Sequence, residues 1–212
     1  AMLKARLLAN SALALILGSL YWNADDDAKL ACVYYSILFV CCNNFLGNVT
    51  TDERPILYRH LQAFQYSPAA HTLARVGASA AVSVLDAVVF GTIVYWMAGF
   101  TASFGRFAFA LLNLVLACIY GDLLWQLTAL ATPNGSARNL VGALIVIALQ
   151  TMTGYTIPEA EIPPYFIWAY WVQPASHVYV SMAQSEFDSE QGKAFLRSRG
   201  VSDAAWRSWL GP

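Results

Sequence analysis

Residues 51–100 read TDERPILYRHLQAFQYSPAAHTLARVGASAAVSVLDAVVFGTIVYWMAGF. The first part is short, charged and aromatic, and it holds Glu53, Arg54, Tyr58 and Arg59. It runs into about 25 residues that are almost entirely apolar, enough for a helix to cross the roughly 30 Å hydrocarbon core of a bilayer. A polar segment joined directly to a membrane-length helix indicates a part that passes force from water into a bilayer.

The composition of the whole chain agrees with a membrane protein. Of its 212 residues, 58% are hydrophobic and 12% are charged, and the mean hydropathy is +0.50. A soluble domain normally carries about 25% charged residues, so most of this surface is expected to face lipid. The net charge of −1 argues against nucleic acid as a partner. The four cysteines lie inside apolar runs, so they imply no disulfide framework.

Five stretches approach the length of a transmembrane helix. They cover about 2–21, 28–49, 76–100, 107–130 and 140–155. Helix is the expected form, because an isolated strand cannot satisfy its backbone hydrogen bonds in lipid, and the alternating pattern of a barrel is absent. The sequence therefore predicts an all-α membrane protein, with a transmembrane domain over 1–155 and an external region over 156–212.

Basic residues between these stretches and at the start of the first one predict the orientation. One set of loops holds Lys4, Arg6, Arg54, Arg59, Arg75 and Arg138. Loops rich in lysine and arginine stay in the cytosol, so we expect the N-terminus inside and the tail after Gly154 outside. Basic residues in the tail run against this rule, which long terminal segments obey weakly. A glycan on Asn48 or Asn134, each the first residue of a sequon, would overturn the assignment.

The segment 53–66 is too polar to span a membrane, and it mixes apolar and charged residues as an interfacial helix does. Ser67-Pro68 is expected to end it, because the residue before a proline avoids helical geometry. Two interpretations fit. One is an ordinary juxtamembrane loop, which composition alone favours, and the other is a helix that docks on a cytosolic motor.

Two blocks of sequence resemble one known family. The first reads ERPILYR at 53–59, YSP at 66–68, AR at 74–75 and YWMAGF at 95–100. The second reads GYTIP at 154–158, IP at 162–163, WAYW at 168–171, P at 174 and SEF at 185–187. Together they resemble the ABC-2 type membrane domain of ATP-binding-cassette transporters, within the G subfamily and its pleiotropic-drug-resistance branch. The resemblance covers nearly the whole chain.

This resemblance implies a function for the polar segment. In the family, the segment between the second and third spans docks on the nucleotide-binding domain, so 53–66 is expected to be a cytosolic coupling helix. Glu53, Arg54, Tyr58 and Arg59 are then its coupling residues. The expected activity is ATP-driven export of hydrophobic or amphipathic compounds, in which the domain alternates between inward-facing and outward-facing states.

The resemblance also implies what lies outside the chain. The sequence contains no G-x-x-x-x-G-K-[ST] phosphate loop, so ATP and Mg²⁺ are expected in a partner nucleotide-binding domain, and the chain is not expected to be an enzyme by itself or to hold a cofactor or metal. Other expected partners are a second transmembrane domain, the lipid bilayer and a hydrophobic small-molecule or lipid substrate. The family has six spans, so a sixth is expected after Pro212, and the expected location is the plasma membrane.

The family's substrate cavity lies between the second and fifth spans, at the interface of two membrane domains. By position, the candidate lining residues are Leu38, Cys41, Cys42, Phe45, Ile147 and Gln150. A wall that is mostly apolar, with a few polar groups, suits hydrophobic or amphipathic substrates.

Four polar residues are expected inside the spans: Asn43, Asn44, Asp86 and Asp122. An acid at the centre of a bilayer is costly unless it is paired or protonated, so each aspartate is either a substrate or proton site or part of an interhelical hydrogen bond. The paired amides are expected to join helices. Two alternatives to an exporter stay open: an ion- or proton-coupled secondary carrier that uses Asp86 and Asp122, and a membrane scaffold that transports nothing.

An aromatic cluster marks the tail. Its members are Tyr165, Phe166, Trp168, Tyr170 and Trp171. Prolines bracket the cluster, and tryptophan and tyrosine prefer the membrane–water interface, so we expect an external re-entrant or interfacial helix here.

Overall fold

The computed structural model describes residues 2–42, 59 and 67–201, and all regular structure within them is helical. The helices are α1 (Met2–Leu20), α2 (Asp26–Cys42), α4 (Pro68–Met97), α5 (Phe104–Ala131), α6 (Gly135–Thr151), the 3₁₀ turn η1 (Glu159–Glu161), α7 (Ile167–Val172), α8 (Pro174–Glu186) and α9 (Glu190–Ser198). This confirms the all-α expectation for the described part of the chain.

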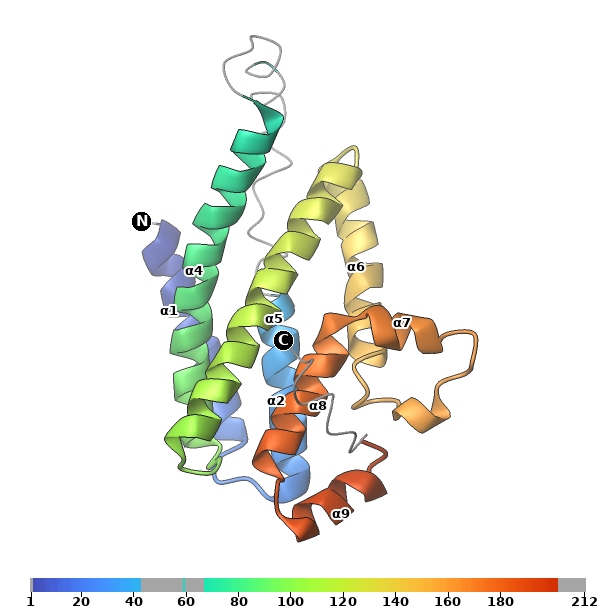
Figure 1. Cartoon of the computed structure of the whole chain (residues 1–212). Helices are drawn as coiled ribbons and strands as arrows, with labels where there is room; N and C mark the ends of the chain where they lie inside the picture. Colours follow the sequence, from blue (N-terminus) through green and yellow to red (C-terminus); the bar gives the residue numbers. More distant parts are fainter. Residues whose placement is uncertain (1, 43–58, 60–66, 202–212) are drawn as a thin grey trace.

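The helices α4 and α5 form a long antiparallel pair joined by a short turn (Figure 1). Both are long and apolar enough to cross a membrane. With 30 residues, α4 is about 45 Å long, more than the hydrocarbon thickness. The apolar part of α1 (Arg6–Leu20) and α6 are shorter. The count of five spans therefore stays a prediction.

The start of α4 is fixed by its cap. Ser67 is the N-cap, its side chain accepts a hydrogen bond from the backbone N–H of Ala70 at 3.2 Å, and Pro68 stands in the first turn. Both residues favour a helix start at this point whatever the hydropathy of the residues that follow. The helix consequently begins well before position 76, where the apolar stretch begins.

The other helices pack around this pair. In Figure 1, α1 lies along α4, while α2 and α8 lie against α5. The contact of α2 with α5 is unusually close at Gly121, because a Cβ atom there would lie only 2.5 Å from the main-chain oxygen of Cys41. Trp125 reinforces this crossing, since its Nε1 donates to the same oxygen at 2.6 Å.

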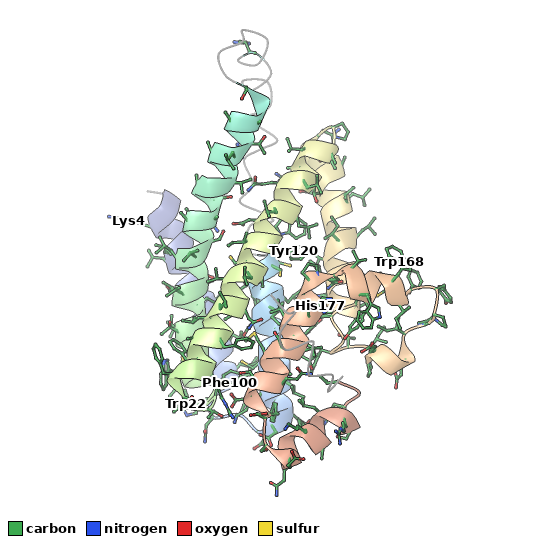
Figure 2. All side chains as sticks on the ribbon, in the orientation of Figure 1. Lys4, Trp22, Phe100, Tyr120, Trp168 and His177 are labelled. Carbon is green, nitrogen blue, oxygen red and sulfur yellow. The ribbon has the colours of Figure 1, made fainter. Side chains whose placement is uncertain are left out.

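The helix α8 belongs to the core of the bundle. Its buried residues are Ala175, Ser176, Val178, Tyr179, Val180, Ser181, Met182 and Ala183. Ser181 Oγ donates to Asn113 Oδ1 of α5 at 2.7 Å inside this contact. The aromatic side chains of the preceding segment, Trp168 among them, are mostly exposed (Figure 2). The chain therefore turns back into the bundle after the aromatic cluster, while the external placement of this region stays a prediction.

The loops divide between two ends of the molecule. The first residues of α4 and the α5–α6 turn lie at one end, and the α1–α2 and α4–α5 connections lie at the other with α9 (Figure 1). Figure 2 accordingly shows Trp22 and Phe100 near each other. The segments that hold Arg75 and Arg138 thus lie at the same end of the molecule, and the orientation in a membrane stays a prediction.

Candidate functional site

Most of the predicted coupling residues lie outside the described part of the chain. They are Glu53, Arg54 and Tyr58, and the candidates Asn43, Asn44 and Phe45 lie outside it as well. Arg59 is described and is exposed. Their predicted roles therefore rest on the sequence.

An apolar stripe on α2 is left uncovered. Tyr35 and Phe39 are each 39% exposed, and Leu38 and Cys42 are half-buried. Positions 35, 39 and 42 follow the spacing that places side chains on one face of a helix. We call these four residues the α2 stripe.

The helix α6 carries a second stripe. Leu140, Leu144 and Ile147 are 67%, 61% and 55% exposed, and Gln150 is also exposed. We call these four residues the α6 stripe. The hydroxyl of Tyr34 in α2 donates to the main-chain oxygen of Gln150 at 3.1 Å, which ties α2 to the end of α6.

One predicted cavity residue lies elsewhere. Cys41 is only 1% exposed, and its Sγ lies 3.5 Å from the main-chain oxygen of Ala117 in α5, to which it donates. Its side chain therefore packs inside the α2–α5 contact. The close approach at Gly121 is the reason, and a glycine within the long apolar stretch 107–130 was the available signal in the sequence.

Asp86 is bound to α1. Its side chain is 1% exposed and forms an ion pair with Arg6, whose Nε donates to Oδ2 at 2.6 Å. Asn10 Nδ2 donates to the main-chain oxygen of Asp86 at 2.9 Å. Sequence reasoning identified the acid but missed Arg6, which stands 80 residues away along the chain.

Asp122 belongs to a polar seam between α4 and α5. Ser83 Oγ donates to its Oδ2, and one turn of α4 away Gln126 Nε2 donates to Ser79 Oγ at 2.9 Å. Both aspartates thus accept hydrogen bonds from neighbouring helices. Such bonds hold helices together where the surroundings are apolar.

A third polar group joins α8 to the α4–α5 turn. Glu186 Oε1 accepts hydrogen bonds from the main-chain N–H and the hydroxyl of Thr101, both at 2.8 Å. Arg106 Nη1 donates to the main-chain oxygen of Glu186 at 3.3 Å, and the hydroxyl of Tyr95 donates to the main-chain oxygen of Thr101 at 2.6 Å. Glu186 is the central residue of the SEF triplet at 185–187, to which the sequence assigned no role.

The described residues hold no group of three or more histidine, cysteine or acidic side chains placed to bind a metal ion. The helical bundle, with its two membrane-length helices, its uncovered apolar stripes and its interhelical polar bonds, defines the class of the chain as an all-helical membrane domain.

The family is shown by comparison with known proteins. Residues 1–187 match the family model described as ABC-2 type transporter, which is most of the chain. The chain belongs to this family, and it is accordingly an integral membrane domain.

Individual relatives of the chain support the same family assignment. The chain is 29% identical over 188 residues to "ABC multidrug transporter H" of Aspergillus fumigatus, a match that covers 84% of this chain and 13% of the relative. It is 30% identical over 181 residues to "ABC transporter G family member 45" of Oryza sativa subsp. japonica, a match that covers 81% of this chain and 13% of the relative. It is 24% identical over 210 residues to "Pleiotropic drug resistance protein 1" of Nicotiana tabacum, a match that covers 91% of this chain and 15% of the relative. These matches confirm the resemblance to the G subfamily, and the chain spans about a seventh of the length of these relatives.

Proposed function

We propose that this chain is the substrate-translocating domain of an ATP-driven exporter of hydrophobic or amphipathic compounds. A nucleotide-binding domain, with its ATP and Mg²⁺, supplies the energy, and a second transmembrane domain completes the path. The expected setting is the plasma membrane, with the N-terminus in the cytosol. Support comes from the family and from relatives whose names describe multidrug transporters.

The observation that carries the proposal is the pair of uncovered stripes. The α2 stripe and the α6 stripe are apolar, with Tyr35 and Gln150 as scattered polar groups. Helices joined by the Tyr34–Gln150 bond would present both to a second membrane domain. A space enclosed there would be mainly apolar with a few orienting polar groups, which suits substrates of this class.

The α2–α5 crossing gives a route for movement. A coupling helix at 53–66 would be joined to α2 on one side and to α4 on the other. Gly121 and Trp125 hold α2 against α5 with no space between the backbones. A displacement at the inner end of α2 would therefore move α5 with it, because close-packed helices do not deform independently.

The bonding of the two aspartates argues against the carrier alternative. A coupled carrier needs an acid that binds and releases an ion during transport, whereas Asp86 is held by Arg6 and Asp122 by Ser83. Both acids lie in contacts of α4 and are buried, with exposed fractions of 1% and 4%. Their arrangement favours a structural role.

The test is uptake of a fluorescent hydrophobic compound into inside-out membrane vesicles that contain this chain together with its nucleotide-binding domain and the second transmembrane domain. An exporter driven by ATP gives uptake that requires Mg-ATP and persists after the proton gradient is collapsed. Asp86→Asn should retain ATP-dependent uptake in proportion to the amount of folded protein. Uptake that survives ATP depletion and disappears in Asp86→Asn would support the carrier instead. Absence of any uptake from an otherwise folded protein would support the scaffold.

A further inference from the structure

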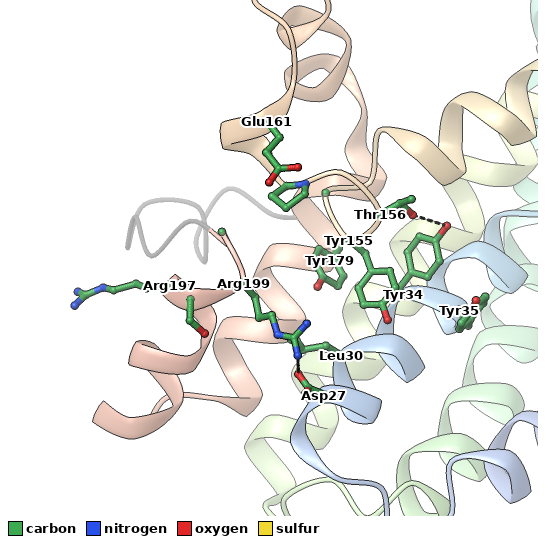
Figure 3. A pocket seen from close by; sticks show the side chains of 14 residues that line it. Asp27, Leu30, Tyr34, Tyr35, Tyr155, Thr156, Glu161, Tyr179, Arg197 and Arg199 are labelled. Carbon is green, nitrogen blue, oxygen red and sulfur yellow. Dashed lines mark hydrogen bonds and ion pairs between the residues drawn. The ribbon is translucent and has the colours of Figure 1, made fainter.

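The charged side chains that line a pocket of about 730 Å³, between the start of α2 and the end of α9, balance one another. Two acids face two arginines there: Asp27, Glu161, Arg197 and Arg199. Figure 3 shows the ion pair that Arg199 forms with Asp27. The buried charged groups between α1, α4 and α5 differ from this arrangement, because they do not balance.

Three charged residues come together inside the bundle. Arg6 of α1 forms its ion pair with Asp86 of α4. Asp122 of α5 bonds to Ser83, which stands three residues before Asp86, so both acids approach the same face of α4. Arg6 and Asp86 are also the charged groups that act on Asp122. We call Arg6, Asp86 and Asp122 the buried charge cluster.

The buried charge cluster contains two carboxylates and one guanidinium, so one negative charge has no partner within it. The polar groups around it do not supply a positive charge. Asn10 of α1 and Ser83 of α4 are uncharged. The thiols of Cys41 in α2 and Cys118 in α5 also face Asp122, and a thiol is neutral at ordinary pH.

Asp86 also has one buried oxygen without a partner. Its Oδ2 accepts the hydrogen bond from Arg6, whereas its Oδ1 is buried and bonds to no described residue. A buried acceptor without a donor is unfavourable, and an unbalanced charge inside a membrane is more so. One small positive ligand beside this oxygen would remove both penalties.

We propose that the buried charge cluster holds one monovalent cation, which is either a proton on Asp122 or a sodium ion between the two carboxylates. Each supplies the single positive charge that the cluster lacks. The cation stays bound and is not carried across the membrane. Its binding requires neither ATP nor a transported compound, so it stands or falls independently of the exporter proposal.

Infrared spectroscopy tests for the proton, with the complete protein in lipid membranes at neutral pH. The C=O stretching band of a protonated carboxyl group lies apart from the bands of an ionised one. If Asp122 holds the proton, this band is present in the unmodified protein and is lost in Asp122→Asn. Glu190→Gln is the control, because Glu190 is an exposed acid of α9 and its substitution should leave the band unchanged.

Thermal unfolding of the complete protein in detergent tests for sodium. Sodium chloride is replaced by N-methyl-D-glucamine chloride at constant pH and ionic strength, because that organic cation is too large for the cluster. A ligand that binds only the folded state raises the unfolding temperature with its concentration. If sodium is the ligand, it should raise this temperature in the unmodified protein and have no such effect in Asp122→Asn.

Substitutions that change the charge of the cluster locate the cation. Asp86→Asn and Asp122→Asn each leave one carboxylate with Arg6, so the infrared band or the sodium effect should be lost in both. Arg6→Lys keeps the charge and should retain the signal. If Asp86→Asn does not fold, the double variant Arg6→Gln/Asp86→Asn replaces it. That variant leaves Asp122 with the excess negative charge, so it should retain the signal.

Absence of both the infrared band and the sodium effect from the folded, unmodified protein would overturn the proposal. So would a signal that is lost in Asp122→Asn but persists in Asp86→Asn, because Asp122 would then hold its cation regardless of the charge of the cluster. Loss of the signal in the double variant would overturn it for the same reason.

Discussion

Arg6 and Asp86 form the ion pair that joins α1 to α4. The aspartate side chain is 1% exposed and that of the arginine 32% exposed, so the carboxylate depends on its partner more than the arginine does. We predict that Arg6→Met destabilises the folded protein by roughly 2–4 kcal/mol, because it leaves an acid among apolar side chains without its counter-ion. Thermal unfolding in detergent measures this effect.

The paired variant Arg6→Met/Asp86→Leu is the control. It replaces both charges with apolar groups and leaves neither buried alone, so stability should return most of the way to that of the unmodified protein. If the double variant is no more stable than Arg6→Met, the lost stability came from packing of the arginine side chain and not from the ion pair.

The buried polar residues could be predicted from the sequence, but their hydrogen-bonding partners could not. The cost of an acid within an apolar stretch made Asp86 and Asp122 stand out, because burial is predictable from local composition. Their partners Arg6 and Ser83 are distant in sequence and could be found only once the helices were packed. The same holds for Glu186, whose bonds to Thr101 depend on α8 returning to the α4–α5 turn.

At the scale of helices, the crossing of α2 and α5 is the tightest contact described. We predict that Gly121→Ala destabilises the protein by about 1–3 kcal/mol, because the added methyl group would meet the backbone of α2, which cannot rotate away. It should also break the bond from Trp125 to the main-chain oxygen of Cys41. A shift in tryptophan fluorescence together with a lower unfolding temperature would report both changes.

Gly77→Ala is the matched control for this substitution. A methyl group at Gly77 in α4 would meet nothing within 4 Å. Alanine is the better helix former, so this variant should be neutral or more stable by up to about 1 kcal/mol. Similar behaviour of the two variants would mean that the close approach at Gly121 does not limit the packing of α2 on α5.

The helices themselves were largely predictable, because apolar stretches of this length have few alternatives in a membrane. The sequence placed a helix at each described position from α1 to α6. It missed the early start of α4, since Ser67 and Pro68 fix that end by capping and not by hydropathy. It also missed that α8 is a core helix, because its mixture of small, polar and apolar residues resembles a surface segment until α2 and α5 enclose it.

For the whole molecule, the distribution of charge predicts the orientation. We expect a cysteine introduced at Ser136, in the first turn of α6, to react with a membrane-impermeant maleimide only after cells are opened. A cysteine at Ser103, before α5 at the other end, should react in intact cells. Both sites are exposed, and the natural cysteines are buried or half-buried, so background labelling should be low. The reverse pattern would invert the orientation.

The segment 53–66 is expected to connect the nucleotide-binding domain to the helical bundle. If 53–66 is the coupling helix, Glu53 contacts the nucleotide-binding domain and has no part in holding the bundle together. Glu53→Ala should then lower transport and substrate-stimulated ATP hydrolysis several-fold while leaving the unfolding temperature unchanged, because a charged contact with a moving partner is lost. Glu190→Ala is the control, since Glu190 is an exposed acid in α9, at the end of the molecule away from the first turn of α4. Transport at the unmodified rate in Glu53→Ala would refute the coupling role. A loss of stability equal to the loss of transport would instead assign Glu53 to the fold.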